Sequence, residues 1–197
     1  MNSGLKNYLL KTMSKEEILP VVNKKNIFIK RAKRSVIHKK GLFHQAVNIL
    51  VVNSQKEIFL QQRSRKKSIC PLLWDISASE HLKVGETYHQ ACLRGLKEEL
   101  KIITRIKIIR NTHLQKNTYF HNKIQDYEYV KLFAALYDKE IFINKEEVET
   151  GKFFTVENLE KKLKTDRKSF TPWFLEEWEY FKKVSNINLI ISSLLKH

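Results

Sequence analysis

The sequence is poor in the residues that build disulfide scaffolds, zinc motifs and irregular loops. Its 197 residues include two cysteines, three prolines and five glycines. Cys70 and Cys92 have no metal-type spacing and form no disulfide framework, which favours a reducing, cytoplasmic environment. With so little proline and glycine and with 42% hydrophobic residues, the chain is predicted to be globular and not disordered.

Long apolar runs are also missing. No run approaches the roughly 20 residues that a membrane span needs, and the N-terminus lacks the continuous apolar region of a signal peptide. Acidic residues are outnumbered, with 21 Asp and Glu against 37 Lys and Arg and a net charge of +16. Such a charge attracts polyanions. Because the lysines are spread along the chain and no RNA-binding motif is visible, we favour lysines that simply coat the surface, and nucleic acid is not the favoured partner.

Local patterns predict one domain of mixed strands and helices. We expect a leader over residues 1–14, a domain over 15–183 and a helical extension over 184–197. A hairpin is predicted over 18–30 and a second over 45–62, followed by strands at 102–109 and 129–137 and a short strand ending at Phe154. Helices are predicted over 87–100, 155–164 and 173–183, and residues 114–125 are expected to form a loop. This order argues for a sheet between helices.

The segment from residue 85 to residue 102 carries the most chemical information. Thr87 and Gln90 form a predicted capping box at the start of the helix, and the helix carries Glu98 and Glu99. Adjacent carboxylates are the hard ligands that Mg²⁺ and Mn²⁺ prefer, although taken alone this pair also fits a solvated surface. Gly95 inside the helix costs roughly 0.5–1 kcal/mol relative to alanine, which is an odd choice unless the space beside the helix is used.

These residues resemble the Nudix box, Gx5Ex7REUxEExGU, in which U is a bulky aliphatic residue. The residues in register are Gly85, Glu86, Arg94, Leu96, Glu98, Glu99 and Ile102. Three positions depart from it: Glu80 stands where the first glycine is expected, Gly95 replaces the first helical glutamate, and Lys101 replaces the last glycine. The resemblance implies a Nudix-type α/β/α sandwich with a mixed β-sheet between helices. It also implies a Mg²⁺ or Mn²⁺ cofactor, with one expected metal ligand missing.

The resemblance extends beyond the box over roughly residues 15–180. It is to the branch of the superfamily that includes the type I isopentenyl-diphosphate isomerases and the hydrolases most similar to them. Residues 34–44 resemble the entry segment of that branch, and residues 60–74 resemble its LLQxRSxxK…PxxW motif. Residues 77–81 stand where the isomerases carry Ser-x-Cys-Gly-His, residues 126–128 where they carry Glu-x-Glu, and residues 170–173 resemble their Phe-Ser-Pro-Trp.

The resemblance also implies roles for individual residues. Arg63 and Lys67 are expected to hold diphosphate oxygens, Arg63 by a forked contact and Lys67 as a point charge. His44 and His81 match isomerase metal ligands, whereas His38 is offset by one residue from the third isomerase histidine. The full set of predicted metal ligands is Glu98, Glu99, Glu86, His44, His81 and Asp126. The predicted catalytic residues are Glu128, Glu98 and Glu99.

Ser79 decides between the activities that the resemblance implies. Isomerases of this type use a cysteine at this position to move a proton to and from carbon, and a hydroxyl of ordinary acidity is a poor substitute. We therefore predict a cation-dependent hydrolase that cleaves a diphosphate linkage in a small organic or nucleoside diphosphate. Two alternatives stay open. One is an isopentenyl-diphosphate isomerase or a weakened relative. The other is a degenerate Nudix domain that binds a phosphorylated ligand or RNA without catalysis, which Gly95 and the net charge support.

Overall fold

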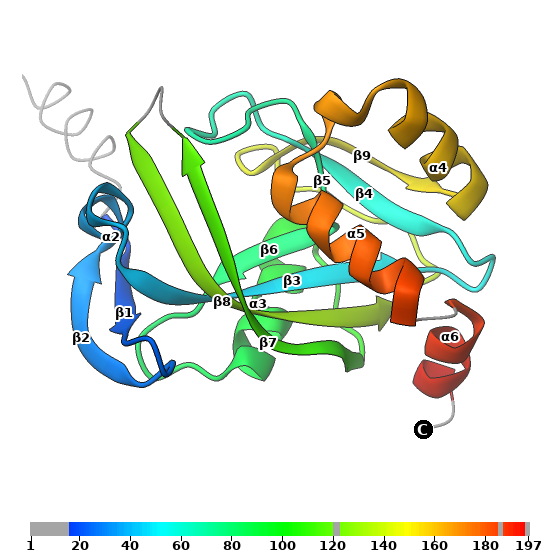
Figure 1. Cartoon of the computed structure of the whole chain (residues 1–197). Coiled ribbons are helices and arrows are strands. Elements are labelled where there is room, and N and C mark those ends of the chain that lie inside the picture. The colour runs from blue at the N-terminus through cyan, green and yellow to red at the C-terminus, as the bar shows by residue number, and fades with distance from the viewer. Residues whose placement is uncertain (1–15, 120–122, 185–186, 196–197) are drawn as a thin grey trace, which may run out of the picture.

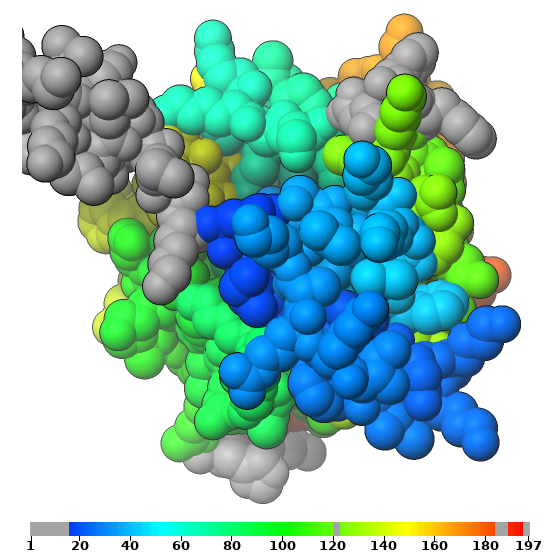
Figure 2. Space-filling view, turned by 90° about the vertical axis from the view of Figure 1, so that its left-hand side faces the viewer, coloured from blue at the N-terminus to red at the C-terminus, as the bar shows by residue number. Residues whose placement is uncertain are grey.

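The computed structural model describes residues 16–119, 123–184 and 187–195, so the predicted leader over residues 1–14 lies outside the described residues. The described chain begins with an antiparallel hairpin of β1 (Ile18–Val22) and β2 (Phe28–Lys33), as the sequence predicts. A short helix, α2 (Arg34–Lys40), follows and ends at Gly41, whose φ is 59°. These three elements, in blue, lie together at one end of the molecule (Figures 1 and 2).

The centre of the molecule is a seven-stranded mixed sheet. Its long strands are β3 (Phe43–Val52), β7 (Ile106–Tyr119) and β8 (Ile124–Leu136). Its short strands are β4 (Ile58–Arg63), β5 (Trp74–Asp75), β6 (Ala78–His81) and β9 (Val148–Phe154). Strand β3 runs parallel to β8 and antiparallel to β4 and β6. Strand β7 pairs with β8, and both β5 and β9 pair with β4.

Alternating side chains along β3 separate two hydrophobic cores, because successive residues of a strand point to opposite faces of the sheet. Val47, Ile49 and Val51 pack towards α3 (Tyr88–Leu100). Leu50 and Val52 pack towards α4 (Val156–Thr165), α5 (Pro172–Val184) and α6 (Ile187–Leu195), with a 3₁₀ turn at Arg167–Ser169 between α4 and α5. Figure 1 shows α3 and α5 on opposite sides of the sheet. The predicted α/β/α sandwich with a mixed sheet between helices is confirmed.

Helix α3 has the start and the buried stripe that the sequence predicts. Thr87 Oγ1 accepts a hydrogen bond from the backbone N–H of Gln90 at 3.2 Å, and Gln90 Oε1 accepts from the backbone N–H of Thr87 at 2.9 Å. Cys92, Leu96 and Leu100 are fully buried at four-residue spacing. Cys92 is therefore a core residue of the helix and takes no part in the site described below.

Removal of the cap is expected to have a moderate effect on stability. Thr87→Ala loses the acceptor of the first turn and should lower the free energy of unfolding by about 1 kcal/mol. Denaturant unfolding measures this, with Thr87→Ser as the control because serine keeps the acceptor. Equal unfolding midpoints for the two variants would contradict the role of the cap.

The hairpin of β7 and β8 is longer than predicted. The strand expected at 102–109 begins at Ile106 and continues to Tyr119, and β8 begins at Ile124. The predicted loop over 114–125 is therefore wrong for its described residues, apart from Lys123. Within β7 only Gln115 is buried, at 1% exposure, and the register shifts between Ile108 and His113. Strand β7 is an edge strand whose one buried residue is polar and whose register shifts twice. Its sequence therefore shows no alternation of apolar and polar residues from which a strand could be predicted.

The C-terminal segment is part of the packed structure. Ile190 and Ile191 of α6 are buried in the same core as Phe174 and Trp178 of α5. Within the predicted helical extension over residues 184–197, the described helix α6 thus contributes apolar side chains to the sandwich. Among the described residues, no helix has both the length and the apolar character that a membrane crossing requires.

Candidate active site

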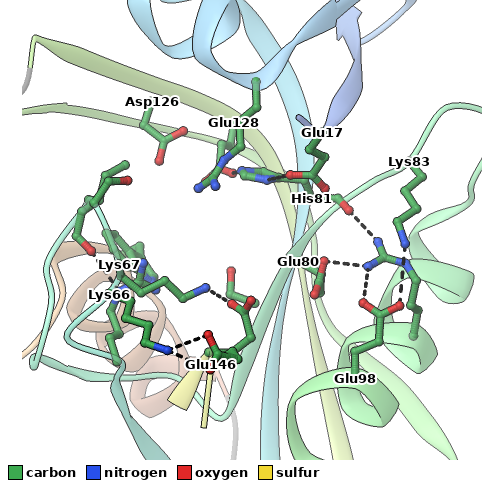
Figure 3. A pocket seen from close by; sticks show the side chains of 18 residues that line it. Glu17, Lys66, Lys67, Glu80, His81, Lys83, Glu98, Asp126, Glu128 and Glu146 are labelled. Atoms are coloured by element: carbon green, nitrogen blue, oxygen red, sulfur yellow. Dashed lines mark hydrogen bonds and ion pairs between the residues drawn. The ribbon is translucent and has the colours of Figure 1, made fainter. Parts of the chain in front are cut away.

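A pocket of about 480 Å³ is lined by residues of α2, β6, β8 and α3 and by the segment before β1, and its walls are mostly charged. Figure 3 shows Asp126, Glu128, His81 and Glu17 on one side, Lys66, Lys67 and Glu146 on another, and Glu80 and Glu98 on a third. The lining residues are Glu17, Arg34, Arg63, Lys66, Lys67, Ser68, Ile69, Ser79, Glu80, His81, Lys83, Arg94, Glu98, Asp126, Glu128, Glu146, Glu147 and Trp173.

A histidine cluster comprises His38, His44, His81, Asp126 and Glu128. Its members His81, Asp126 and Glu128 line the pocket, whereas His38 and His44 are buried and do not belong to the lining. Strand register assembles most of the cluster. His44 lies directly opposite Glu128 in the parallel pairing of β3 with β8. Two residues along β3, Ala46 lies opposite His81 of β6. Because residues two apart share a face of a strand, His44, His81, Asp126 and Glu128 project from the same side of the sheet.

The fifth member, His38, comes from the last turn of α2. The left-handed Gly41 ends this helix and turns the chain into β3, and a Cβ at Gly41 would meet Gln125 Oε1 at 2.4 Å. The His38 ring lies 5.3 Å from the His44 ring and 5.7 Å from the His81 ring, between centroids. The structure therefore brings His38 into the cluster although its sequence position is offset by one residue.

Each histidine faces a carboxylate through Nε2. The distances to Asp126 Oδ1 are 3.4 Å from His38 and 3.4 Å from His44, and Glu128 Oε1 lies 3.4 Å from His44 and 3.3 Å from His81. Burial, together with the neighbouring histidines, lowers the pKa of His38 to about 3. Burial opposes protonation of His81, but its contacts with Glu128 and Glu17 raise its pKa to about 9.

The two carboxylates of the cluster differ in acidity. Burial and the charge of Glu128 raise the pKa of Asp126 to about 6. Burial also disfavours the ionised form of Glu128, yet its close contacts with His44 and His81 hold its pKa well below the ordinary value. Glu128 is thus ionised at neutral pH, beside the charged imidazole of His81.

The cluster fits a divalent metal ion. The buried atoms His38 Nε2, His44 Nε2 and Asp126 Oδ1 have no hydrogen-bond partner among the described residues. The Nδ1 of His44 lies 3.2 Å from the carbonyl of Leu42, which suits a tautomer that leaves Nε2 as a metal ligand. Ligand atoms of His38, His44, His81 and Asp126 all lie within 4.8 Å of one another. Two ligands of one ion stand at most about 4.2 Å apart, so only small side-chain shifts are needed.

The carboxylates of α3 lie beside the cluster but in a different environment. Glu99 is 4% exposed and accepts hydrogen bonds from Gln61 Nε2 at 2.9 Å and from the backbone N–H of Ser79 at 3.1 Å. Burial and the charge of Glu80 raise the pKa of Glu99 to about 8. The Glu98 side chain is 50% exposed and lies 3.6 Å from Lys83 Nζ.

Arg94 joins the loop before α3 to the helix. Its Nε and Nη2 donate to the two oxygens of Glu86, each at 2.9 Å, and Nη2 also donates to the carbonyl of His81 at 2.8 Å. The backbone N–H of Lys83 is a further donor to Glu86, at 2.8 Å. Glu86 is absent from the pocket lining. Its predicted role as a metal ligand stays a prediction, while its observed contacts hold the loop against α3.

The predicted substrate-binding residues lie in the pocket wall opposite β6. Arg63 is held by Asp75 Oδ2 at 2.8 Å, and its guanidinium lies 5.0 Å from the centroid of the Trp173 ring. Lys67 pairs with Glu147, and Lys66 Nζ lies 2.7 Å from Glu146 Oε2. The wall thus presents a fixed guanidinium and two ammonium groups whose partners are carboxylates of the segment before β9.

Ser79 is one of the residues that line the pocket. Its hydroxyl donates to Asn48 Oδ1 at 3.0 Å, and Asn48 Nδ2 donates to the buried Glu177 at 3.2 Å. The immediate partner of the hydroxyl is an uncharged amide and not a base. This contact gives Ser79 no means of supplying or removing a proton at carbon, which agrees with the difficulty seen in the sequence.

The structure adds residues to the site that sequence reasoning missed or left out. For His38 a signal existed, since a histidine stands six residues before His44. For Glu80 the signal was its place at the first box glycine. Glu17 Oε2 lies 3.5 Å from His81 Nδ1. Glu17, Glu146 and Glu147 belong to no sequence motif, so the sequence carried no signal for them.

The fold and the carboxylate-bearing helix define a Nudix protein. The model of the NUDIX domain matches residues 42–174, and the chain belongs to this family. It is 30% identical over 175 residues to isopentenyl-diphosphate Delta-isomerase 2 of Photorhabdus laumondii, covering 83% of this chain and 98% of the relative. It is 28% identical over 148 residues to an uncharacterized Nudix hydrolase of Listeria monocytogenes, covering 75% and 84%.

Solved structures share the fold. A crystal structure from Deinococcus radiodurans has a TM-score of 0.61 at 22% identity, covering 76% of this chain and 90% of that one. The MutT protein of Methanosarcina mazei has a TM-score of 0.59 at 17% identity, covering 72% and 94%. The suspected family and branch are confirmed, because the relatives include both isomerases and Nudix hydrolases.

Proposed function

We propose that the protein is a divalent-cation-dependent hydrolase that cleaves a diphosphate linkage in a small organic or nucleoside diphosphate. The observation that carries the proposal is a pocket lined by carboxylates, by His81 of the histidine cluster and by lysine side chains. A diphosphate needs both kinds of partner. Carboxylates hold a Mg²⁺ ion that binds the phosphate oxygens, and Lys or Arg neutralises the remaining negative charge.

Two sets of side chains in and beside this pocket suit ions of different character. Glu98 and Glu99 offer oxygen ligands only, which fits Mg²⁺ or Mn²⁺. The histidine cluster offers three imidazoles with Asp126 and Glu128, which fits Mn²⁺ or Zn²⁺ better than Mg²⁺. A bound divalent ion lowers the pKa of its water and offsets charge on the phosphates.

The chain's own residues then divide the remaining tasks. Lys66 and Lys67 can exchange their carboxylate partners for phosphate oxygens, so substrate binding would release Glu146 and Glu147. Arg63 cannot swing freely because Asp75 and Trp173 hold it, so it serves as a fixed donor. Glu98, Glu99 and Glu128 are the candidates to accept the proton of the attacking water.

A substrate panel tests the proposal. Nucleoside diphosphates, nucleoside diphosphate derivatives and prenyl diphosphates are incubated with Mg²⁺ or Mn²⁺, and phosphate and nucleoside monophosphate release are measured. We expect turnover of at least one class that stops when EDTA is added and returns when the ion is restored. Binding of these compounds without any release would contradict hydrolysis and favour the degenerate, binding-only domain.

A second candidate is isomerisation of a small unsaturated diphosphate, favoured by the complete histidine cluster and by the likeness to a relative named an isopentenyl-diphosphate Delta-isomerase. Its difficulty is Ser79. Incubation with isopentenyl diphosphate in deuterated water separates the two candidates, since only isomerisation introduces deuterium at carbon. If the protein is a hydrolase only, the unaltered protein should introduce no deuterium into isopentenyl diphosphate or its products.

A further inference from the structure

Glu80 and Gly95 face each other across the contact between β6 and α3. An ideal Cβ at Gly95 would lie 2.7 Å from Cγ of Glu80 and 3.4 Å from its Cβ. The first distance is shorter than real Cβ contacts allow, and Cγ is near the backbone end of the side chain. A side chain at position 95 and a glutamate at position 80 therefore compete for the same space.

Space, and not backbone conformation, explains the glycine. Gly95 lies inside α3 with ordinary helical geometry, unlike Gly41 and Gly85, whose φ values are positive. It is buried between Glu80 and Ile49. Each of the two positions carries the residue type that the Nudix box expects at the other, glycine at 80 and glutamate at 95. The structure thus shows a reciprocal exchange between two residues in contact.

The exchanged carboxylate reaches the pocket. Glu80 lies on β6 between Ser79 and His81, and strand alternation turns it towards α3 while its two neighbours face the other side. Its side chain is 18% exposed and lines the pocket together with Glu98. Glu99 contacts the residue next to Glu80 in β6, because it accepts a hydrogen bond from the backbone N–H of Ser79 at 3.1 Å. Arg94 Nη1 donates to Oε2 of Glu80 at 2.7 Å.

We propose that Glu80 is a metal ligand and replaces, from strand β6, the helix carboxylate that is missing at position 95. With Glu98 and Glu99 it completes a set of three carboxylates around one ion, and Arg94 orients it by holding Oε2. This inference rests on the proposed function, because it concerns the same carboxylate-held ion. It makes the departure from the box a relocation of a ligand and not a loss.

Charge removal separates this role from a merely structural one. Glu80→Gln keeps the length of the side chain and an oxygen that can accept from Arg94, but it removes the carboxylate. Zn²⁺ first fills the histidine cluster at one equivalent, and Mn²⁺ is then titrated while free Mn²⁺ is followed by electron paramagnetic resonance. We expect Mn²⁺ to bind Glu80→Gln about 10-fold or more weakly than the parent, in the range typical of altered metal sites.

The matched control is Glu157→Gln, an exposed glutamate of α4 that lies 2.8 Å from Lys161. It should leave Mn²⁺ affinity and melting temperature unchanged. If the Zn²⁺-loaded parent itself binds no Mn²⁺, the carboxylate site of the proposed function is wrong and this inference falls with it. If the parent binds Mn²⁺ and Glu80→Gln binds it equally well, only the role of Glu80 is wrong.

The exchange itself is tested by reversing it. Gly95→Glu alone should lower the melting temperature of the metal-free protein, because the new side chain meets Glu80. Glu80→Gly alone should weaken Mn²⁺ binding. The double variant Glu80→Gly/Gly95→Glu should melt above Gly95→Glu and bind Mn²⁺ within about threefold of the parent, a coupling expected of residues in contact. A double variant that binds Mn²⁺ no better than Glu80→Gly would overturn the relocation, whether or not Gly95→Glu alone folds.

Discussion

Glu99→Gln is expected to lower kcat for cation-dependent diphosphate hydrolysis by about 10³-fold, which corresponds to roughly 4 kcal/mol of transition-state stabilisation. The Glu99 side chain is 4% exposed, and Gln61 and the backbone N–H of Ser79 hold its two carboxylate oxygens. A glutamine keeps one acceptor oxygen for the Ser79 N–H, and its NH2 group can bond Gln61 once the amide of Gln61 turns to present its unpaired oxygen. It cannot neutralise a metal ion. Phosphate release under saturating Mg²⁺ or Mn²⁺ measures the effect.

The same variant should become more stable without metal. Because burial and Glu80 raise the pKa of Glu99 from 4.5 to about 8, the folded protein prefers the protonated form. The contribution of this group to stability is complete below the unfolded pKa and is lost as the pH rises through the folded pKa. Metal-free Glu99→Gln should therefore melt about 3 °C or more above the parent near pH 9, equivalent to roughly 1 kcal/mol, and the difference should shrink towards pH 5.

Glu157→Gln serves again as the control, because its side chain is 77% exposed and far from any predicted ligand role. It should show neither the loss of turnover nor the pH-dependent gain in melting temperature. If Glu99→Gln hydrolyses the substrate as fast as the parent, the assignment of the cation to α3 fails. A loss of turnover together with a fall in melting temperature at every pH would indicate a structural role for Glu99.

His44→Asn is expected to abolish metal binding by the histidine cluster. His44 is fully buried, its Nε2 faces both Asp126 and Glu128, and no described residue satisfies that nitrogen. Asparagine is too short to reach an ion at the same place. At an ion concentration 100 times Kd, Zn²⁺ or Mn²⁺ should raise the free energy of unfolding of the parent by about 2.7 kcal/mol. The variant should show almost none of this gain.

Metal content after dialysis and melting temperature with and without EDTA measure the result. The matched control is His89→Asn, because His89 is an exposed histidine in the first turn of α3. It should retain the metal and the shift in melting temperature. If Zn²⁺ and Mn²⁺ leave the parent's melting temperature unchanged, the cluster is a proton-sharing network of histidines and carboxylates and not a metal site.

Part of the candidate site was predictable because its signals are local. The capping box at Thr87 and the buried stripe of Cys92, Leu96 and Leu100 depend on residues within a few positions of one another, and both are present in α3. Helix periodicity then places Glu98 and Glu99 at the helix end that meets β6. The pairs His44 with Glu128 and Ala46 with His81, in contrast, depend on strand register across long stretches of chain.

Other features could not be read from the chain because their causes are not local. Strand β7 extends through residues 114–119, where hydrophobic periodicity fails, since its stability comes from pairing with β8. Arg63 looked like a free phosphate ligand, yet the fold places Asp75 at 2.8 Å from it. His38 seemed displaced by one residue, but the turn at Gly41 brings its ring towards the other two histidines.

The sequence by itself determined the family, the sandwich class, the limits of α3 and the residue types that can bind a cation. These depend on composition, on the order of elements and on contacts within one or two helical turns. Only the tertiary structure decided which of those residues share a pocket, because parallel pairing of β3 with β8 and packing of α3 on β6 join segments distant in the chain. The meeting of Glu80 with Gly95 is of this second kind, since the two departures look unrelated until β6 and α3 are packed together.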